Sequence, residues 1–157
     1  MSGVFSCIEN LDMKSFKIET IKEGVMVKDL YGDTPLHACV LKKDLEFVEE
    51  IMEYNPDLNA QNHKGQTALH YAAELNLVRI ASLLLRCGGD PNIQDKYGNN
   101  PLWSAIFYDK GFGNNLELIK LLLDFNSDKN HKNLAGLSPL DFAKKANYPE
   151  VVSLLEN

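Results

Sequence analysis

The side chains in this sequence that could bind a metal ion or attack a substrate are three cysteines and four histidines. Cys7, Cys39 and Cys87 are widely separated, form no Cys-x-x-Cys pair, and have no histidine at the spacing of a zinc site. Because their number is odd and their spacing fits neither a disulfide framework nor a metal site, the sequence predicts reduced thiols and no bound metal ion.

Known catalytic motifs are also missing from the sequence. It contains no Gly-x-Ser-x-Gly turn, no His-Glu-x-x-His helix motif and no glycine loop that could cradle a phosphate. The segment Gly111-Phe112-Gly113 is too short a glycine pattern to indicate nucleotide binding. We therefore expect no catalytic residues, no cofactor and no small-molecule substrate. Intrinsic hydrolase or transferase activity of the purified protein would reopen the enzyme class.

Composition places the chain among ordinary globular proteins of about one domain, with 157 residues, 45% hydrophobic and 24% charged. Its 22 acidic and 16 basic side chains give a net charge of −6, which repels a phosphate backbone. Only Arg79 and Arg86 among the basic residues are arginines, the type best suited to bidentate phosphate capture. Direct nucleic-acid binding is therefore disfavoured.

The amino terminus has no basic region followed by an apolar stretch, and nowhere do 18 apolar residues run together. We expect a cytoplasmic protein without a membrane partner.

A four-residue pattern recurs along the chain and marks the start of each repeating unit. Thr34-Pro35-Leu36-His37 is echoed by the tetrads that begin at Thr67, Asn100 and Ser138, at steps of 33, 33 and 38 residues. A glycine stands two positions before each tetrad, where a turn needs a conformation that a side chain would strain. Thr, Asn and Ser are good N-cap residues, and proline suits the first helical position. A helix is therefore predicted to begin at each tetrad.

About ten residues after each predicted helix start, a second apolar pattern appears. Phe47, Val48 and Ile51 illustrate its i, i+1, i+4 spacing, which forms one stripe on a helix. A unit of some thirty residues buries too few such side chains, at roughly 1.5–3 kcal/mol each, to offset an ordering cost of roughly 1–2 kcal/mol per residue. The units must therefore stack into a solenoid.

The tetrads, their 33-residue spacing and the segment Gly88-Gly89-Asp90-Pro91-Asn92-Ile93 resemble ankyrin repeats over about residues 29–157. The resemblance implies an all-α solenoid of antiparallel helix pairs with hairpin-like fingers. We divide the single domain, 1–157, into an N-terminal capping unit (1–28), repeats 29–61, 62–94 and 95–132, and a C-terminal capping repeat (133–157). In the capping unit, Val4–Ile8 forms a candidate short first helix, and Phe16, Ile18 and Ile21 before Gly24 echo a second helix and its stop.

The third repeat departs from the pattern in two ways. Five extra residues lie in a loop over residues 108–115, which is either a neutral insertion or a partner contact presenting Phe112. Trp103 stands where other repeats have His37 and His70, which the resemblance makes structural residues that tie a helix start to the neighbouring turn. Trp103 either fills space against Phe107 and the adjacent repeat or contacts a partner. Cys39 replaces a small buried residue and is expected to be inert.

The resemblance further implies that fingers and inner helices bind a partner protein. Carried over by position, the candidate partner-binding residues are Leu30, Tyr31, Asp33, Leu41, Lys42, His63, Lys64, Gln66, Glu74, Lys96, Tyr97, Asn99, Trp103, Phe107, Tyr108 and Phe112. Aromatic anchors with a polar rim are typical of protein interfaces.

The chain also resembles short ankyrin proteins of bacterial toxin–immunity systems, in the segments 100–105 and 138–143. That resemblance implies an immunity protein that neutralises a toxin. Residues 1–60 hold 12 acids and 6 bases, whereas residues 61–157 hold 10 of each, so a basic toxin domain would suit the acidic first third, although a solubilising cap explains it too. The alternative is a scaffold, adaptor or effector that recruits another cellular or host protein.

Overall fold

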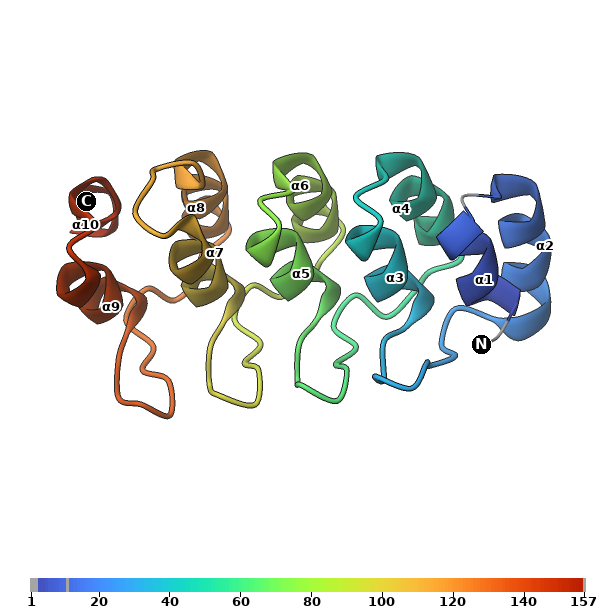
Figure 1. Cartoon of the computed structure of the whole chain (residues 1–157), viewed down its shortest axis with the longest axis horizontal. Coiled ribbons are helices and arrows are strands. Elements are labelled where there is room, and N and C mark those ends of the chain that lie inside the picture. The colour runs from blue at the N-terminus through green and yellow to red at the C-terminus, as the bar shows by residue number, and fades with distance from the viewer. Residues whose placement is uncertain (1–2, 11, 157) are drawn as a thin grey trace.

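Helices arranged in a row of pairs make up the architecture (Figure 1). The computed structural model describes residues 3–10 and 12–156, except for the side chains of residues 18 and 21, so the interpretation of Ile18 and Ile21 lies outside the described part. The helices are α1 (Gly3–Asn10), α2 (Met13–Glu23), α3 (Pro35–Leu41), α4 (Leu45–Met52), α5 (Ala68–Glu74), α6 (Val78–Arg86), α7 (Pro101–Asp109), α8 (Leu116–Asp124), α9 (Pro139–Ala146) and α10 (Pro149–Glu156). The described residues contain no β-strand. The predicted all-α solenoid is confirmed.

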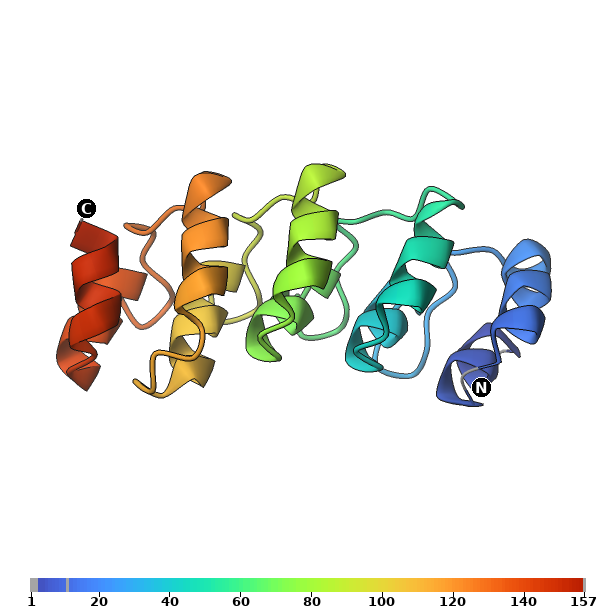
Figure 2. The ribbon, with the colours of Figure 1, turned by 90° about the horizontal axis from the view of Figure 1, so that it is seen from above.

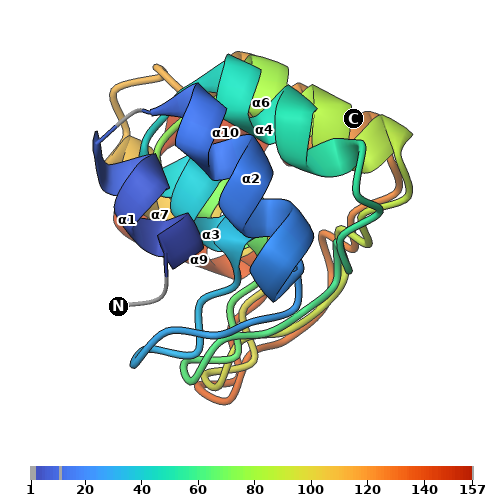
Figure 3. The same cartoon turned by 90° about the vertical axis from the view of Figure 1, so that its right-hand side faces the viewer.

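In each of the four pairs after α1 and α2, an inner helix (α3, α5, α7 or α9) lies beside a finger and an outer helix (α4, α6, α8 or α10) lies away from it (Figure 1). The fingers, residues 29–33, 62–66, 95–99 and 133–137, are tight turns. From above, the outer helices follow one another along the row (Figure 2), and a view along the row shows all fingers on one side of the stack (Figure 3). We call the face formed by fingers and inner helices the inner surface.

The tetrads begin helices for the reasons that their residue types suggest. The backbone N–H of Thr67 donates to Nδ1 of His70 at 3.1 Å, and Nε2 of His70 therefore carries the hydrogen and donates to the carbonyl oxygen of Asn99 at 3.1 Å. His37 makes the equivalent bonds to Thr34 and to the carbonyl oxygen of Gln66. The predicted structural role of both histidines, tying a helix start to the next finger, is confirmed.

The core runs along the whole row, between successive helix pairs. The apolar stripes of the outer helices are buried as predicted, including Val48, Ala81 and Ile119, which have no exposed surface. The rings of Phe16 and Phe47 meet edge to face at 5.0 Å and join the first pair to the second. Each such side chain contributes roughly 1.5–3 kcal/mol through burial, so adjacent pairs stabilise one another.

The amino-terminal segment forms the expected helix pair. Val4 and Ile8 of α1 are buried, and the carboxylate of Glu23 accepts a hydrogen bond from the N–H of Gly3 at 2.8 Å. Gly24 ends α2 with a φ of +80°, a conformation that favours glycine. The further division of the chain into capping units and repeats stays a prediction.

All three cysteines are free thiols. Cys7 and Cys39 are buried, and burial raises the pKa of the Cys39 thiol far above its usual range. Cys39 is therefore protonated and inert as a nucleophile at neutral pH, as its place in the repeat predicted. Cys87 is exposed at the end of α6.

The loop between α7 and α8 is organised by one buried carboxylate. Asp109 is 2% exposed and accepts hydrogen bonds from the N–H of Gly113 at 2.9 Å and of Asn115 at 2.8 Å. The amide of Asn115 in turn donates to the carbonyl oxygen of Ala105 at 2.8 Å. Phe112 remains 75% exposed at the tip. The inserted residues thus form a defined turn that presents an aromatic ring to solvent.

Candidate functional site

The fingers form a continuous, hydrogen-bonded comb. The carboxylate of Asp95 accepts the N–H groups of Tyr97 at 2.8 Å and Asn99 at 2.9 Å, which closes the turn. The N–H of Lys96 donates to the carbonyl oxygen of Lys64 at 2.9 Å, so this finger is fixed to the one before it. Equivalent bonds join the first finger to the second and the third to the fourth. The side chains on the fingers are therefore held by a rigid frame.

Most of the predicted partner-binding residues lie on the inner surface with side chains in solvent. Those that are exposed are Leu30, Tyr31, Leu41, Lys42, His63, Lys64, Lys96, Tyr97, Phe107, Tyr108 and Phe112. Glu74, Asn99 and Trp103 are half-buried.

Asp33 and Gln66 differ from this picture because both are buried. The carboxylate of Asp33 accepts hydrogen bonds from the amide of Asn62 at 2.7 Å and the hydroxyl of Tyr71 at 3.2 Å. The amide of Gln66 donates to the carboxylate of Glu74. Both side chains make internal polar contacts because finger and inner helix pack together, and their contact with a partner stays a prediction.

An aromatic cluster joins α7 to α9. The rings of Trp103 and Phe107 stack at 5.2 Å with an angle of 21°, and Phe142 of the next inner helix lies 4.8 Å from Trp103. Tyr108 meets Phe107 edge to face at 5.3 Å. Trp103 therefore packs against Phe107 and the adjacent repeat, and its contact with a partner stays a prediction. Its indole N–H is buried and has no acceptor among the described residues.

Between α5 and α7, the inner surface contains a cleft of about 400 Å³, which we call the inner cleft. Its lining residues are Lys64, Gln66, Tyr71, Glu74, Asp95, Tyr97, Asn99, Trp103, Ser104, Phe107 and Tyr108. Half of the predicted partner-binding residues meet here. Leu30, Tyr31, Leu41 and Lys42 belong to the first repeat and are not part of it, and Phe112 lies against a separate hollow beside Tyr148.

Sequence reasoning missed three residues of this lining, namely Tyr71, Asp95 and Ser104. Tyr71 and Ser104 occupy the same repeat position, 33 residues apart, as do Ala38 and Phe142 in the other repeats. A position that alternates between small and aromatic residues was the available signal, because side chains that shape a surface differ between repeats while stacking residues do not. Asp95 was assigned only to its turn.

Burial and negative charge set the electrostatics of the inner cleft. Burial raises the pKa of Glu74 above its ordinary value, while the hydrogen bond from Gln66 and the charge of Lys64 act in the opposite direction. Burial, followed by the charge of Glu74, raises the pKa of the Tyr108 hydroxyl. At neutral pH the tyrosine is therefore a neutral hydrogen-bonding group beside a carboxylate.

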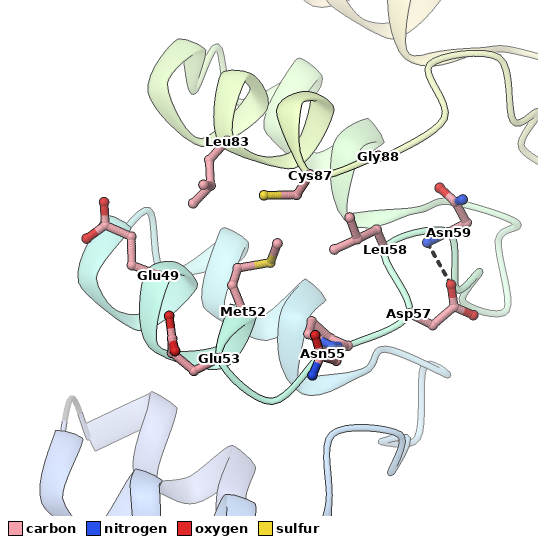
Figure 4. A pocket seen from close by; sticks show the side chains of 11 residues that line it. Glu49, Met52, Glu53, Asn55, Asp57, Leu58, Asn59, Leu83, Cys87 and Gly88 are labelled. Atoms are coloured by element: carbon pink, nitrogen blue, oxygen red, sulfur yellow. Dashed lines mark hydrogen bonds between the residues drawn. The ribbon is translucent and has the colours of Figure 1, made fainter.

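A second hollow, the outer cleft, lies between the ends of α4 and α6 and has a volume of about 610 Å³ (Figure 4). Met52, Leu83 and Cys87 line it together with Glu49 and Glu53. None of the predicted partner-binding residues belongs to this lining. Within residues 3–10 and 12–156, no group of three His, Cys, Asp or Glu side chains is arranged to hold a metal ion.

Comparison with known proteins agrees with this geometry. A family model described as ankyrin repeats in three copies matches residues 5–95, 36–133 and 76–157. The chain belongs to the ankyrin-repeat family.

Ankyrin-repeat relatives come from viruses, bacteria and animals. The chain is 34% identical over 122 residues to a protein of Acanthamoeba polyphaga mimivirus named as an ankyrin repeat protein, covering 78% of this chain and 15% of the relative. It is 35% identical over 112 residues to a similarly named protein of Rickettsia felis, covering 69% and 49%. It is 34% identical over 117 residues to neurogenic locus notch homolog protein 1 of Danio rerio, covering 73% and 4%. The chain thus spans less than half of each of these relatives.

Ankyrin repeats are protein–protein interaction modules, since their stacking leaves an extended inner surface free for a partner. No helix in the described ranges combines the length and the apolar character needed to cross a bilayer.

Proposed function

We propose that this ankyrin-repeat protein binds its partner through the inner surface, with the inner cleft at the centre of the contact. The observation that carries the proposal is the gathering of Tyr97, Phe107 and Tyr108, all exposed, around one cleft with a polar rim. An exposed aromatic side chain adds less to the stability of the fold than a buried one does. At a protein interface, however, aromatic side chains supply much of the binding energy. The rigid comb of fingers lowers the ordering cost of binding.

We further propose that the partner is a bacterial toxin, neutralised in the cytosol by occlusion of its active site. The acidic first third supports a basic toxin: Glu46 and Glu49 on α4 and Glu53 directly after it are exposed, and a surface of one sign accelerates association with the opposite charge. The rigidity of the solenoid also suits occlusion, because a stiff surface can cover a site without folding around it.

Affinity capture from the source cells, followed by mass spectrometry and co-expression, tests this function. A captured protein that stops growth when expressed alone, and no longer does so with this chain present, is the expected result. A captured partner that is not toxic would favour the adaptor role over toxin neutralisation. If the chain is an immunity protein, its gene is expected to lie directly beside the toxin gene. Failure of the inner-surface variants described below to weaken capture would overturn the proposed binding surface.

A further inference from the structure

Glu74, at the end of α5, is an incompletely paired carboxylate. One of its oxygens, Oε1, accepts the hydrogen bond from the amide of Gln66. Its second oxygen, Oε2, takes part in no hydrogen bond to the described residues, and no basic side chain among them lies within ion-pair distance of Glu74. A half-buried anion without a counterion is costly, and an opposite charge from outside would relieve that cost.

The other acidic side chain in the inner cleft is already engaged. Asp95 accepts the N–H groups of Tyr97 and Asn99 and the side-chain amide of Asn99. Lys64 is the basic residue of the lining, and its charge reaches Glu74 without forming an ion pair. The cleft therefore has two carboxylates against one ammonium group, within a chain of net charge −6.

Four aromatic side chains share the inner cleft with this carboxylate, namely Tyr71, Trp103, Phe107 and Tyr108. The face of an aromatic ring attracts a cation. The molecule itself gives an example at the rim, where the ammonium group of Lys96 lies 4.9 Å from the ring centre of Tyr97. A planar guanidinium suits such a place best, because it stacks on rings and pairs with a carboxylate at the same time.

We infer that the inner cleft receives an arginine side chain of the partner polypeptide, with its guanidinium paired to Glu74 and stacked among the aromatic rings. This inference rests on the proposed function and adds the chemistry that the partner must present. A volume of about 400 Å³ lies near the lower end of the range for ligand sites, roughly 300–1,000 Å³, and leaves room for one long side chain with part of its backbone.

The single tryptophan makes the inference measurable, because Trp103 lines the cleft and reports on it without a label. The probe is the peptide acetyl-Gly-Ser-Arg-Ser-Gly-amide, compared with the same peptide carrying citrulline, the neutral isostere of arginine. The arginine peptide is expected to change Trp103 emission in a saturable way at concentrations up to about 10 mM, with at least about tenfold weaker binding of the citrulline peptide. Equal binding of the two peptides, or no saturable change with arginine, overturns the inference.

Two variants that each remove one negative charge distinguish a specific contact in the inner cleft from a general effect of the net charge. Glu74→Gln keeps an oxygen for the hydrogen bond from Gln66 and is expected to weaken the arginine peptide about tenfold. Glu117→Gln, at an exposed position on the outer helix α8, removes the same charge away from both clefts and is expected to leave binding unchanged. Equal losses in both variants contradict a specific pairing. Circular dichroism melts of both variants establish that each is folded.

The same variants distinguish failure of this inference from failure of the proposed function. If a captured partner protein binds wild type and Glu74→Gln equally well, the arginine inference is wrong, while the proposed binding to the inner surface still stands. If the cleft binds the arginine peptide selectively but all inner-surface variants capture the partner as well as wild type does, the proposed binding surface is wrong instead.

Discussion

Nε2 of His70 donates a hydrogen bond to the carbonyl oxygen of Asn99 at 3.1 Å, and this contact fixes α5 to the finger that carries Tyr97. A residue that links one repeat to the next therefore also positions one wall of the inner cleft. Stability and binding geometry are linked through a buried, neutral imidazole.

That neutrality predicts a pH dependence of stability. Burial lowers the pKa of His70 and of His37 below the ordinary value of 6.5, so the unfolded chain binds more protons once the pH falls below that value. The free energy of unfolding should be highest above about pH 6.5 and should decrease as the pH falls towards the pKa values of the two histidines in the folded state. Each histidine contributes about 1.4 kcal/mol for every pH unit by which its folded-state pKa lies below 6.5. Urea unfolding at pH 7.5, 6.5 and 5.5 measures it.

The histidine contribution is isolated by His70→Gln, which should flatten part of the pH dependence while lowering stability at pH 7.5. A midpoint of urea unfolding that is the same at all three pH values would show that burial of the imidazoles does not control stability.

Replacing Gly65 should disrupt the comb of fingers. Gly65 has a φ of +74°, and an added Cβ would lie 2.8 Å from the backbone nitrogen of Lys96. Gly65→Ala therefore combines backbone strain with a clash against the next finger and should cost about 2–3 kcal/mol of unfolding free energy.

Gly136→Ala is the matched control, because Gly136 has the same φ of +74° but nothing within 4 Å of an added Cβ. It should cost only about 1 kcal/mol, from the backbone alone. Chemical denaturation compares the two, and equal losses would mean that the contact between fingers adds nothing.

The loop between α7 and α8 should depend on Asp109. Asp109→Ala leaves the N–H groups of Gly113 and Asn115 without their acceptor and should lower the free energy of unfolding by about 2 kcal/mol. Phe112→Ala, at the exposed tip, should change it by less than about 0.5 kcal/mol. Urea denaturation of both variants measures these losses. The prediction is wrong if Phe112→Ala lowers the free energy of unfolding more than Asp109→Ala does.

The double variant Tyr97→Ala with Tyr108→Ala tests the inner surface as a binding site. The two rings are 58% and 46% exposed, so their removal should leave the melting temperature nearly unchanged. Binding to the captured partner should weaken by about 2 kcal/mol or more, roughly thirtyfold, as expected for aromatic anchors.

Surface plasmon resonance with the captured partner measures that loss, and differential scanning calorimetry measures stability. A large fall in melting temperature would instead assign these two tyrosines to the core.

The sequence by itself determined the repeat, the helix starts and the stacking. These follow from interactions between residues a few positions apart, such as the bond from Thr67 to His70, and from apolar stripes that recur with the period of the chain. The buried place of Cys39 and the structural role of His37 could be inferred in the same way, because each has an equivalent in another repeat.

Only the tertiary structure decided which side chains meet. Asp33 is buried because Tyr71, 38 residues later, donates to it, and Glu74 shares a cleft with Tyr108 of the next inner helix. The loop insertion breaks the repeat period, so its bond from Asn115 to Asp109 had no equivalent to reveal it. Periodicity specifies that neighbouring repeats touch, whereas the distance and angle between two stacked repeats determine whether a polar side chain faces solvent, a neighbour or a cleft.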